Sequence, residues 1–271
     1  MSLDFAINHM ASPQLSLSDF FALATDLGVS RVEIRNDIAG NAILDGTSAS
    51  DVRQQASDAG VTIISINALQ HFNVWSSQRA AEAETLAAYC LESGAEALVL
   101  VADNSGNVPD SAATRISNAT EALAGLAPIL RRYSIIGLVE CLGFEACSLR
   151  SKKEAVAAID AADARDVFRL THDTFHHHLA GEPELFPELT GLVHISGVED
   201  SSIEVRDMRD GHRVLVGSAD RLDNVGQIAA LRRGGYSGPL SFEPFAEQLR
   251  HLTHPAQALR ESIEFVTNGL N

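Results

Sequence analysis

Amphipathic segments and short apolar runs alternate along the chain, and a glycine commonly separates the two. "FFALATDLG" leads into "VSRVEIR", and "LAAYCLESG" leads into "AEALVLVA". A glycine just past a helix is the expected left-handed cap, and helices that alternate with strands are typical of a parallel sheet. Eight runs have the composition of strands, and they cover residues 3–9, 31–36, 61–67, 97–102, 135–140, 167–173, 192–196 and 239–245.

The eight strand-like runs predict an α/β protein with the fold of a single (β/α)8 TIM barrel. An open doubly wound sheet shows the same alternation, but its usual GxGxxG turn does not follow the first run. The 271 residues match the length of one such barrel, and no stretch has the composition of a linker. We therefore expect one domain over residues 1–271.

Alternate side chains of a barrel strand face the lumen, and those that face the surrounding helices must be apolar. In the run 31–36 this rule directs Val32 and Ile34 outward, and it directs Glu33 and Arg35 into the lumen. One interpretation is an interior ion pair that only packs the barrel, since buried charges need partners. Because both side chains lie near the carboxyl end of the strand, where barrels carry their active sites, we favour a role in lining the site.

The same rule places one ionisable side chain in the lumen at the end of each of the last four runs. These residues are Glu140, Asp173, His194 and Glu243. Three carboxylates that converge in one barrel mouth repel one another unless a cation neutralises them. We therefore predict one divalent metal ion there, and three oxygen ligands with one imidazole suit Mn²⁺, Zn²⁺, Co²⁺ or Mg²⁺.

Composition and charge narrow the choice of partners. Hydrophobic residues make up 45% and charged residues 21% of the chain, as in ordinary globular proteins with a sizeable core. The formal net charge of −16 repels phosphate backbones and anionic lipid. The start "MSLDFAINHM" has no basic segment followed by an apolar one, so we expect a cytoplasmic protein without nucleic-acid or membrane partners.

Four motifs resemble a known family. "LVECLGF", "HDTFHHH", "LVHISGVED" and "SFEPF", in this order at the strand ends, are similar to the xylose-isomerase-like superfamily of sugar isomerases and epimerases. Within it they are most similar to the inosose (2-keto-myo-inositol) isomerases of inositol catabolism. The resemblance covers essentially the whole barrel, and it implies that the four strand-end residues hold the metal.

The resemblance also implies residues that bind substrate. It assigns substrate contact to His176, three residues after Asp173, with His172 facing the helices. The two residues after Asp173 would turn the chain over the barrel rim, and His177 and His178 would line a loop or face solvent. Related enzymes often carry a second glutamate six residues after the first; position 146 is Ala here, and Glu145 precedes it.

Relatives also place a substrate-binding arginine after the seventh strand. This sequence offers Arg206, Arg209 and Arg213 in a long loop, and the motif does not separate them; we take Arg206 as the candidate. Asn67 and His71 follow the third strand and are further candidates for the substrate pocket. The alternative for each is a hydrogen bond to loop backbone.

These residues together favour a metal-dependent isomerase or epimerase. The substrate would be a keto sugar or inosose without phosphate, because the glycine-rich "GGYSG" precedes the eighth strand and lies on the wrong face for a phosphate cradle. Glu140 and Glu243 would exchange a proton on the carbon beside the carbonyl, through an enediolate. Three alternatives remain: an inosose or dehydroshikimate-type dehydratase, an AP endonuclease-like hydrolase, and a sugar-binding barrel without catalysis. A homo-oligomer is compatible with each.

Overall fold

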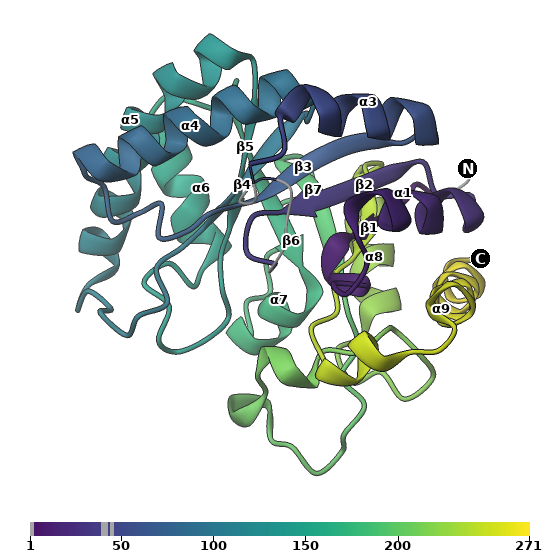
Figure 1. Ribbon diagram of the computed structural model, residues 1–271. Helices are drawn as coiled ribbons and strands as arrows, with labels where there is room; N and C mark the ends of the chain where they lie inside the picture. Colours follow the sequence, from purple (N-terminus) through teal and green to yellow (C-terminus); the bar gives the residue numbers. More distant parts are fainter. Residues whose placement is uncertain (1–2, 39–42, 44–45) are drawn as a thin grey trace.

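Eight parallel strands close into a barrel in the order of the sequence, which confirms the predicted (β/α)8 TIM barrel (Figure 1). The structure, a computed structural model, describes residues 3–38, 43 and 46–271. The strands are β1 (Phe5–Asn8), β2 (Arg31–Arg35), β3 (Thr62–Leu69), β4 (Ala97–Val101), β5 (Ile136–Glu140), β6 (Phe168–Asp173), β7 (Thr190–Ile195) and β8 (Leu240–Phe242). Each predicted run overlaps one of these strands, and β3 and β7 extend beyond theirs by two residues.

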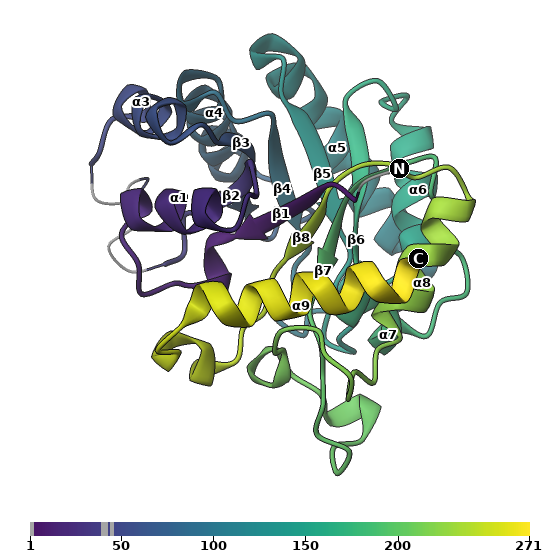
Figure 2. The ribbon, with the colours of Figure 1, turned by 90° about the vertical axis from the view of Figure 1, so that its right-hand side faces the viewer.

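Helices cover the outside of the barrel (Figures 1 and 2). They are α1 (Leu17–Asp26), α3 (Ala49–Ala59), α4 (Ser77–Ser93), α5 (Ala112–Tyr133), α6 (Lys152–Ala161), α7 (Thr174–Ala180), α8 (Asn224–Arg233) and α9 (Pro255–Leu270). Short 3-10 helices cover His9–Ala11, Val205–Asp207, Asp210–His212 and Glu247–His251. In the part of the chain that the structure describes, no helix has both the length and the apolar character that crossing a membrane requires.

Local sequence explains where the helices begin and end. A serine side chain accepts a hydrogen bond from a first-turn backbone N–H at the start of five helices, and these serines are Ser16, Ser48, Ser76, Ser111 and Ser151. Gly60 and Gly94 end α3 and α4 with φ of 70° and 78°, the left-handed conformation that glycine adopts without steric cost. The predicted glycine stops are confirmed at both positions.

The last strand is shorter than the run 239–245 that the sequence predicts. The backbone N–H of Glu243 still donates to the carbonyl oxygen of Ile195, at 2.9 Å. Pro244 has no N–H, so the ladder of hydrogen bonds ends there. The side chain of Glu243 is thereby held at the mouth of the barrel, one residue beyond β8.

An apolar layer fills the amino half of the lumen. Its members are buried and pack on one another, apart from the larger core between barrel and helices: Ala6, Ile64, Ala68, Ala97, Val99, Leu138 and Leu192. Glu140 and His194 lie two positions after Leu138 and Leu192 on the same strands, so they face the same lumen one layer higher. The buried charges Glu140 and His194 thus lie on the carboxyl side of the apolar layer.

A long segment, residues 196–223, joins β7 to α8 and extends below the barrel in Figures 1 and 2, on the side where α7 follows β6. Its only regular pairing among the described residues is an antiparallel bridge between Gly197 and Val214. This bridge returns the chain to the end of β7.

Candidate metal centre

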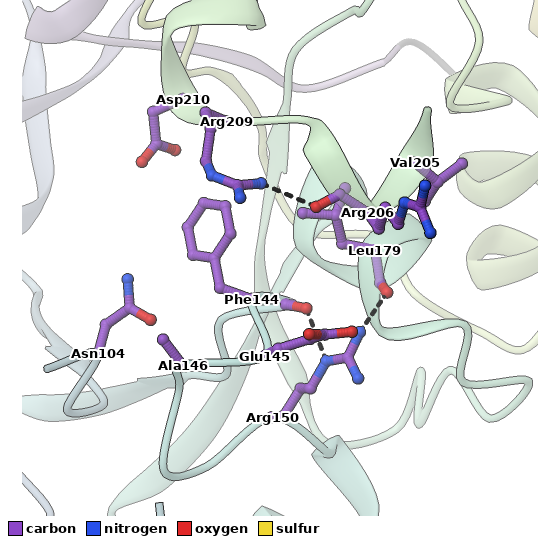
Figure 3. Close-up of a pocket in the computed structure, with 11 residues that line it drawn as sticks. Asn104, Phe144, Glu145, Ala146, Arg150, Leu179, Val205, Arg206, Arg209 and Asp210 are labelled. Atoms are coloured by element: carbon purple, nitrogen blue, oxygen red, sulfur yellow. Dashed lines mark hydrogen bonds between the residues drawn. The ribbon is translucent and has the colours of Figure 1, made fainter. Parts of the chain in front are cut away.

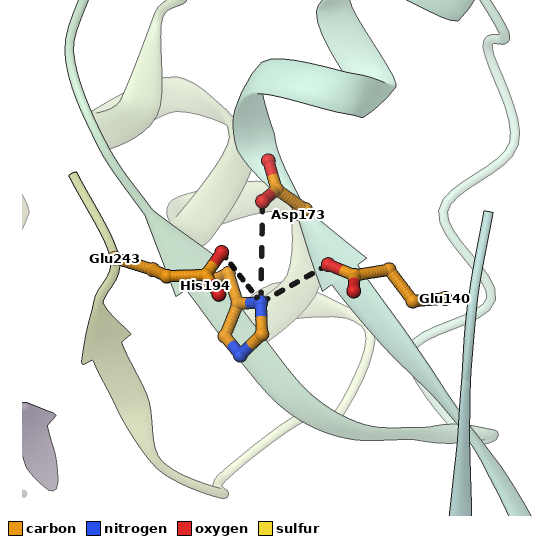
Figure 4. Close-up of side chains that lie close together, drawn as sticks. All are labelled: Glu140, Asp173, His194 and Glu243. Atoms are coloured by element: carbon orange, nitrogen blue, oxygen red, sulfur yellow. Dashed lines mark hydrogen bonds and ion pairs between the residues drawn. The ribbon is translucent and has the colours of Figure 1, made fainter. Parts of the chain in front are cut away.

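Four side chains from β5, β6, β7 and the end of β8 meet at the carboxyl end of the lumen (Figure 4). Glu140, Asp173, His194 and Glu243 each offer one ligand atom, and these atoms all lie within 4.8 Å of one another. All four residues are buried. The structure therefore brings together the set of side chains that strand alternation predicts.

The imidazole of His194 is the centre of this group. Its Nδ1 lies 3.1 Å from Oε1 of Glu140, 3.2 Å from Oε2 of Glu243 and 3.9 Å from Oδ2 of Asp173. Its Nε2 lies 3.2 Å from Oε2 of Glu33, on the other side of the ring. A carboxylate only accepts hydrogen bonds, so Nε2 carries a proton for Glu33, and in the neutral ring the Nδ1 lone pair faces the other carboxylates. Metal-binding histidines are commonly oriented in this way.

Glu33 is fully buried, and four donors surround its carboxylate. Besides His194, Oε2 accepts from Ser65 Oγ at 2.5 Å and from Asn67 Nδ2 at 2.8 Å, while Oε1 accepts from Ser241 Oγ. Burial alone would raise its pKa, but the charge of His194 and these hydrogen bonds lower the pKa of Glu33 to about 2. Four donors match the roughly four acceptor sites of a carboxylate. Glu33 thus contacts both His194 and Asn67 inside the barrel, and both Glu33 and Asn67 are buried.

Arg35 does not pair with Glu33, so the interior ion pair between these two neighbours is not what the structure shows. Its Nε and Nη2 donate to Asp37, both at 2.7 Å, and its Nη1 donates to Oε1 of Glu243 at 2.6 Å. The side chain is 5% exposed. Arg35 therefore holds one carboxylate oxygen of Glu243, which is a candidate metal ligand.

Arg213, and not Arg206, enters the site from the loop after β7. Its Nη2 donates to Oδ2 of Asp173 at 2.6 Å and to Oε2 of Glu243 at 3.1 Å. The pairing of Gly197 with Val214 places Arg213 beside the end of β7. The side chain of Arg206 is 79% exposed and contacts none of the four candidate ligands. Of the two, Arg213 is therefore the arginine that reaches the candidate ligands.

The two carboxylate oxygens of Asp173 have different partners. Its Oδ1 accepts from the backbone N–H groups of Phe175 and His176, at 2.8 and 3.1 Å, and so caps α7. Its Oδ2 faces His194 and Arg213. The sequence predicts that the two residues after Asp173 turn the chain over the barrel rim. This prediction is wrong in detail, because the cap starts α7 immediately after β6.

His176 lies at the start of α7 and is 4% exposed. Its ring packs edge-on against Phe144 and Phe175, with centroids 5.1 and 5.2 Å away. Its Nδ1 is buried and has no hydrogen-bond partner among the described residues. A buried polar atom without a partner is costly, and one beside a candidate active site is commonly satisfied by a ligand.

The remaining histidines of the motif belong to the outside of the barrel. His172 is buried, and its Nδ1 lies 2.9 Å from Nζ of Lys152, as its predicted orientation toward the helices requires. Nδ1 of His177 lies 2.8 Å from the same Nζ, so His177 packs in a helix and is not a loop residue. Burial lowers the pKa of Lys152 to about 8. His178 is half-buried in the same helix.

His71 lies apart from the four candidate ligands. Its Nδ1 is 2.7 Å from Oδ1 of Asp103, and it lines a separate cavity of about 270 Å³ with Asn73, Arg79 and Ser148. The side chain is 46% exposed. The structure thus places His71 in its own polar cavity.

The formal charges of the buried side chains around the candidate ligands do not balance. The buried charge cluster consists of four carboxylates, two guanidiniums and one imidazole: Glu33, Glu140, Asp173, Glu243, Arg35, Arg213 and His194. Four negative and two positive charges leave −2 with a neutral imidazole, and −1 with a protonated one. Asp37 and Asp210 also contact the guanidiniums, but they are 37% and 47% exposed, where solvent screens them.

The pKa values of the cluster reflect this imbalance. Burial opposes protonation of His194, but the charges of Glu243 and Glu33 raise the pKa of its imidazole well above the usual value. Burial is also the main reason that the pKa of Glu140 is raised. Protons thus neutralise the cluster in part. One divalent cation with a neutral His194 would bring the formal sum to zero, so the donor set fits such an ion.

A closed (β/α)8 barrel with a candidate metal centre at its carboxyl end defines the class of this protein. The chain belongs to the xylose isomerase-like TIM barrel family, whose family model matches residues 21–268. This membership confirms the superfamily that the four motifs indicate. No curated protein matches the chain significantly.

Solved structures give the same fold. A xylose isomerase domain containing protein from Salmonella typhimurium LT2 is 33% identical, with a TM-score of 0.90 over 100% of this chain and 99% of the other. The IOLI protein with a bound zinc atom is 21% identical, with a TM-score of 0.86 over 99% of this chain and 98% of the other. A D-psicose 3-epimerase, solved with D-fructose, is 16% identical, with a TM-score of 0.72 over 99% of each chain.

Proposed function

We propose that this protein is a metal-dependent isomerase or epimerase of a keto sugar or keto-inositol that carries no phosphate. The observation that carries the proposal is the buried set of four ligand atoms, with Nδ1 of His194 directed at three carboxylates by Glu33. Related barrels support it, since the named neighbours include the D-psicose 3-epimerase and a 3-keto-D-glucoside 4-epimerase. The zinc in the IOLI structure supports a divalent metal.

Glu140, Asp173, His194 and Glu243 would hold the metal. When bound, the ion supplies Lewis acidity to a carbonyl and its neighbouring hydroxyl, which acidifies the carbon–hydrogen bond between them. Arg213 contacts the carboxylates of Asp173 and Glu243, and Arg35 contacts that of Glu243, so the two guanidiniums hold both carboxylates in place. They offset part of the negative charge of the site.

Proton transfer falls to the two glutamates on either side of the His194 ring (Figure 4). The pKa of Glu243 is held well below its usual value, because the charges of His194, Arg213 and Arg35 outweigh the effect of burial. Glu140 has no arginine partner among the described residues, and burial raises its pKa. In this proposal Glu140 and Glu243 exchange the proton on the carbon beside the carbonyl from opposite faces of the substrate, through an enediolate.

His176 holds a substrate oxygen in this proposal. Its unpartnered Nδ1 is the feature that suits this role, because a substrate hydroxyl can donate to it or accept from it. The T-shaped contact with Phe144 fixes the ring while leaving that nitrogen without a protein partner. Positioning of this kind contributes to catalysis by fixing the reacting carbon near the base.

The experiment is solvent exchange. Protein loaded with Mn²⁺, incubated in D₂O with D-fructose or 2-keto-myo-inositol, should introduce deuterium at the carbon beside the carbonyl, as observed by proton NMR. Glu140→Gln, loaded with the same metal, is the control. Product mass separates the alternatives, because a dehydratase releases water and an isomerase does not. An absence of exchange with every ketose offered, at full metal occupancy, would contradict the proposal.

A further inference from the structure

A cavity with a partly polar lining lies outside the ring of candidate metal ligands. Its volume is about 540 Å³, within the range of small-molecule sites (Figure 3). The segments after β5 and β7 and the end of α7 form its walls. None of the four candidate ligands lines it, so it is a separate compartment at the barrel mouth.

One layer of side chains separates this cavity from the metal ligands. Phe144 lines the cavity and packs against His176 on its other side, with ring centroids 5.1 Å apart. Asp210 also lines the cavity and contacts Nη1 of Arg213 at 3.3 Å, and Arg213 in turn contacts Asp173. A substrate that spans the candidate ligands and the cavity would therefore contact His176 and Arg213, which lie between them.

Arginines dominate the charge of the cavity. Arg150, Arg206 and Arg209 line it together with two carboxylates, Glu145 and Asp210, and Asp210 is shared with the nearby guanidinium at position 213. The lining therefore has an excess of positive charge, although the chain as a whole carries −16. Such a local reversal of sign attracts an anion to this point of the surface.

Nε of Arg206 lies 3.7 Å from Oδ2 of Asp207, whereas the other two guanidiniums are held in place by backbone rather than neutralised by carboxylates. Arg150 donates to the carbonyl oxygens of Gly143 and Leu179, both at 2.6 Å, and Arg209 donates to those of Arg206 and Met208 at 2.9 and 2.7 Å. Within the described part of the chain, no carboxylate oxygen lies within 4.0 Å of Arg150 or Arg209. Their charge remains free to bind a ligand, since carbonyl groups orient a guanidinium without cancelling its charge.

We infer that this cavity binds a carboxylate of the substrate, so that the substrate is a keto sugar acid with its carbonyl at the metal centre and its carboxylate among the arginines. The inference rests on the proposed function, which it makes more specific. A planar carboxylate matches the two parallel donors of a guanidinium. A carboxylate is favoured over a phosphate ester because the glycine-rich segment 234–238 precedes β8 and so lies at the opposite end of the strands.

The test compares three compounds that differ only at carbon 6: D-fructuronate, D-fructose and D-fructose 6-phosphate. Deuterium exchange by the Mn²⁺-loaded protein should show a kcat/KM for D-fructuronate about tenfold or more above that of D-fructose, as charge-assisted hydrogen bonds allow. Arg206→Gln and Arg209→Gln should each remove about tenfold or more of the D-fructuronate rate and leave the D-fructose rate within about twofold. Both side chains are exposed, so folding should be unaffected.

Arg165→Gln is the matched control, because Arg165 is an exposed arginine at the opposite end of the barrel, just before β6. Equal rates for D-fructose and D-fructuronate, or a preference for the phosphate ester, would overturn the inference and leave the proposed function standing. Calorimetric binding of D-fructuronate gives a readout without turnover. Binding that depends on Arg206 and Arg209, with no exchange of any of the three compounds, would support the anion site and remove the proposed function.

Discussion

The lumen of this barrel holds two layers that the same strands build from opposite kinds of side chain. In the amino half, Leu138 and Leu192 pack with other apolar residues. Two positions further along the same strands, Glu140 and His194 belong to the buried charge cluster. Both layers are almost completely buried, with exposures of 5% or less for these four residues.

The difference lies in how burial acts on stability. Removing apolar surface from water stabilises the lower layer by about 25 cal/mol per Å² of area. Removing charges from water destabilises the upper layer unless they are paired. The apolar layer therefore stabilises the fold, and in the proposed function the charged layer carries the chemistry. Four experiments test this division, in order of decreasing expected effect.

The largest effect should come from removing a base while keeping its shape. Glu140→Gln and Glu243→Gln retain an oxygen and a similar volume, so each should bind metal yet lose turnover by about 10² to 10⁴, the usual contribution of positioned acid–base catalysis. The measurement is the exchange rate at equal metal occupancy. Recovery of most activity in either variant would show that its carboxylate is only a ligand.

The next effect belongs to the apolar layer. Leu192→Ala removes a side chain that is 1% exposed, and it should lower the free energy of unfolding by about 2–5 kcal/mol. Metal affinity should change little, because His194 keeps its hydrogen bond to Glu33. Leu91→Ala, at a side chain 53% exposed, is the control and should stay within about 0.5 kcal/mol. If Leu192→Ala abolished metal binding in a folded protein, the two layers would not be separable.

Glu33→Gln tests the support behind the metal ligands. It keeps the size of the side chain but weakens the orientation of His194, so metal affinity should fall by about 10- to 100-fold. The measurement is a titration with Zn²⁺ or Mn²⁺ against a competing chelator. Glu96→Gln, at an exposed glutamate, supplies the matched control. Unchanged affinity in Glu33→Gln would mean that the carboxylate only packs the barrel.

Metal binding should depend on pH because His194 must be neutral to bind. Without metal, neighbouring carboxylates raise the pKa of His194 well above its usual value against the effect of burial, so we expect the ring to keep its proton to a higher pH than a free imidazole does. Binding then releases that proton, and affinity should rise with pH by up to about tenfold per unit until the pH exceeds the pKa. Calorimetry in buffers of different ionisation enthalpy counts the protons. Affinity that is constant between about pH 6 and pH 8 would contradict the assignment of His194 as a ligand.

Strand alternation was sufficient to place the centre of the site. Outward positions of a barrel strand must be apolar, so the flanking residues of Glu140 and His194 fixed the direction of both side chains. The same rule placed Glu33 and Arg35 in the lumen, but it could not identify their partners. The partners of Glu33 come from neighbouring strands, since the register of the sheet pairs it with Ser65 on β3. Those of Arg35 are Asp37 and Glu243.

Strand alternation does not apply to the loop after β7, so its structure could not be predicted from the sequence. Residues 196–223 have no repeating pattern, so nothing in the sequence distinguished Arg213, which is buried, from Arg206, which is exposed. The short α7 was also missed, because seven residues are too few for a clear helical period. Its start depends on the cap by Asp173, a residue already assigned to the strand.

Metal stoichiometry tests the central claim most directly. Protein exposed to Mn²⁺ or Zn²⁺ and then freed of unbound ions should retain about one divalent ion per chain, as measured by elemental analysis, and Asp173→Ala should release it. Asp173→Asn keeps the acceptor that caps α7, so a loss of metal there cannot be ascribed to unfolding of the helix. Asp200→Ala, at an exposed aspartate, should retain the ion. A parent protein that retains no metal, or an Asp173→Ala variant that retains all of it, would contradict the account.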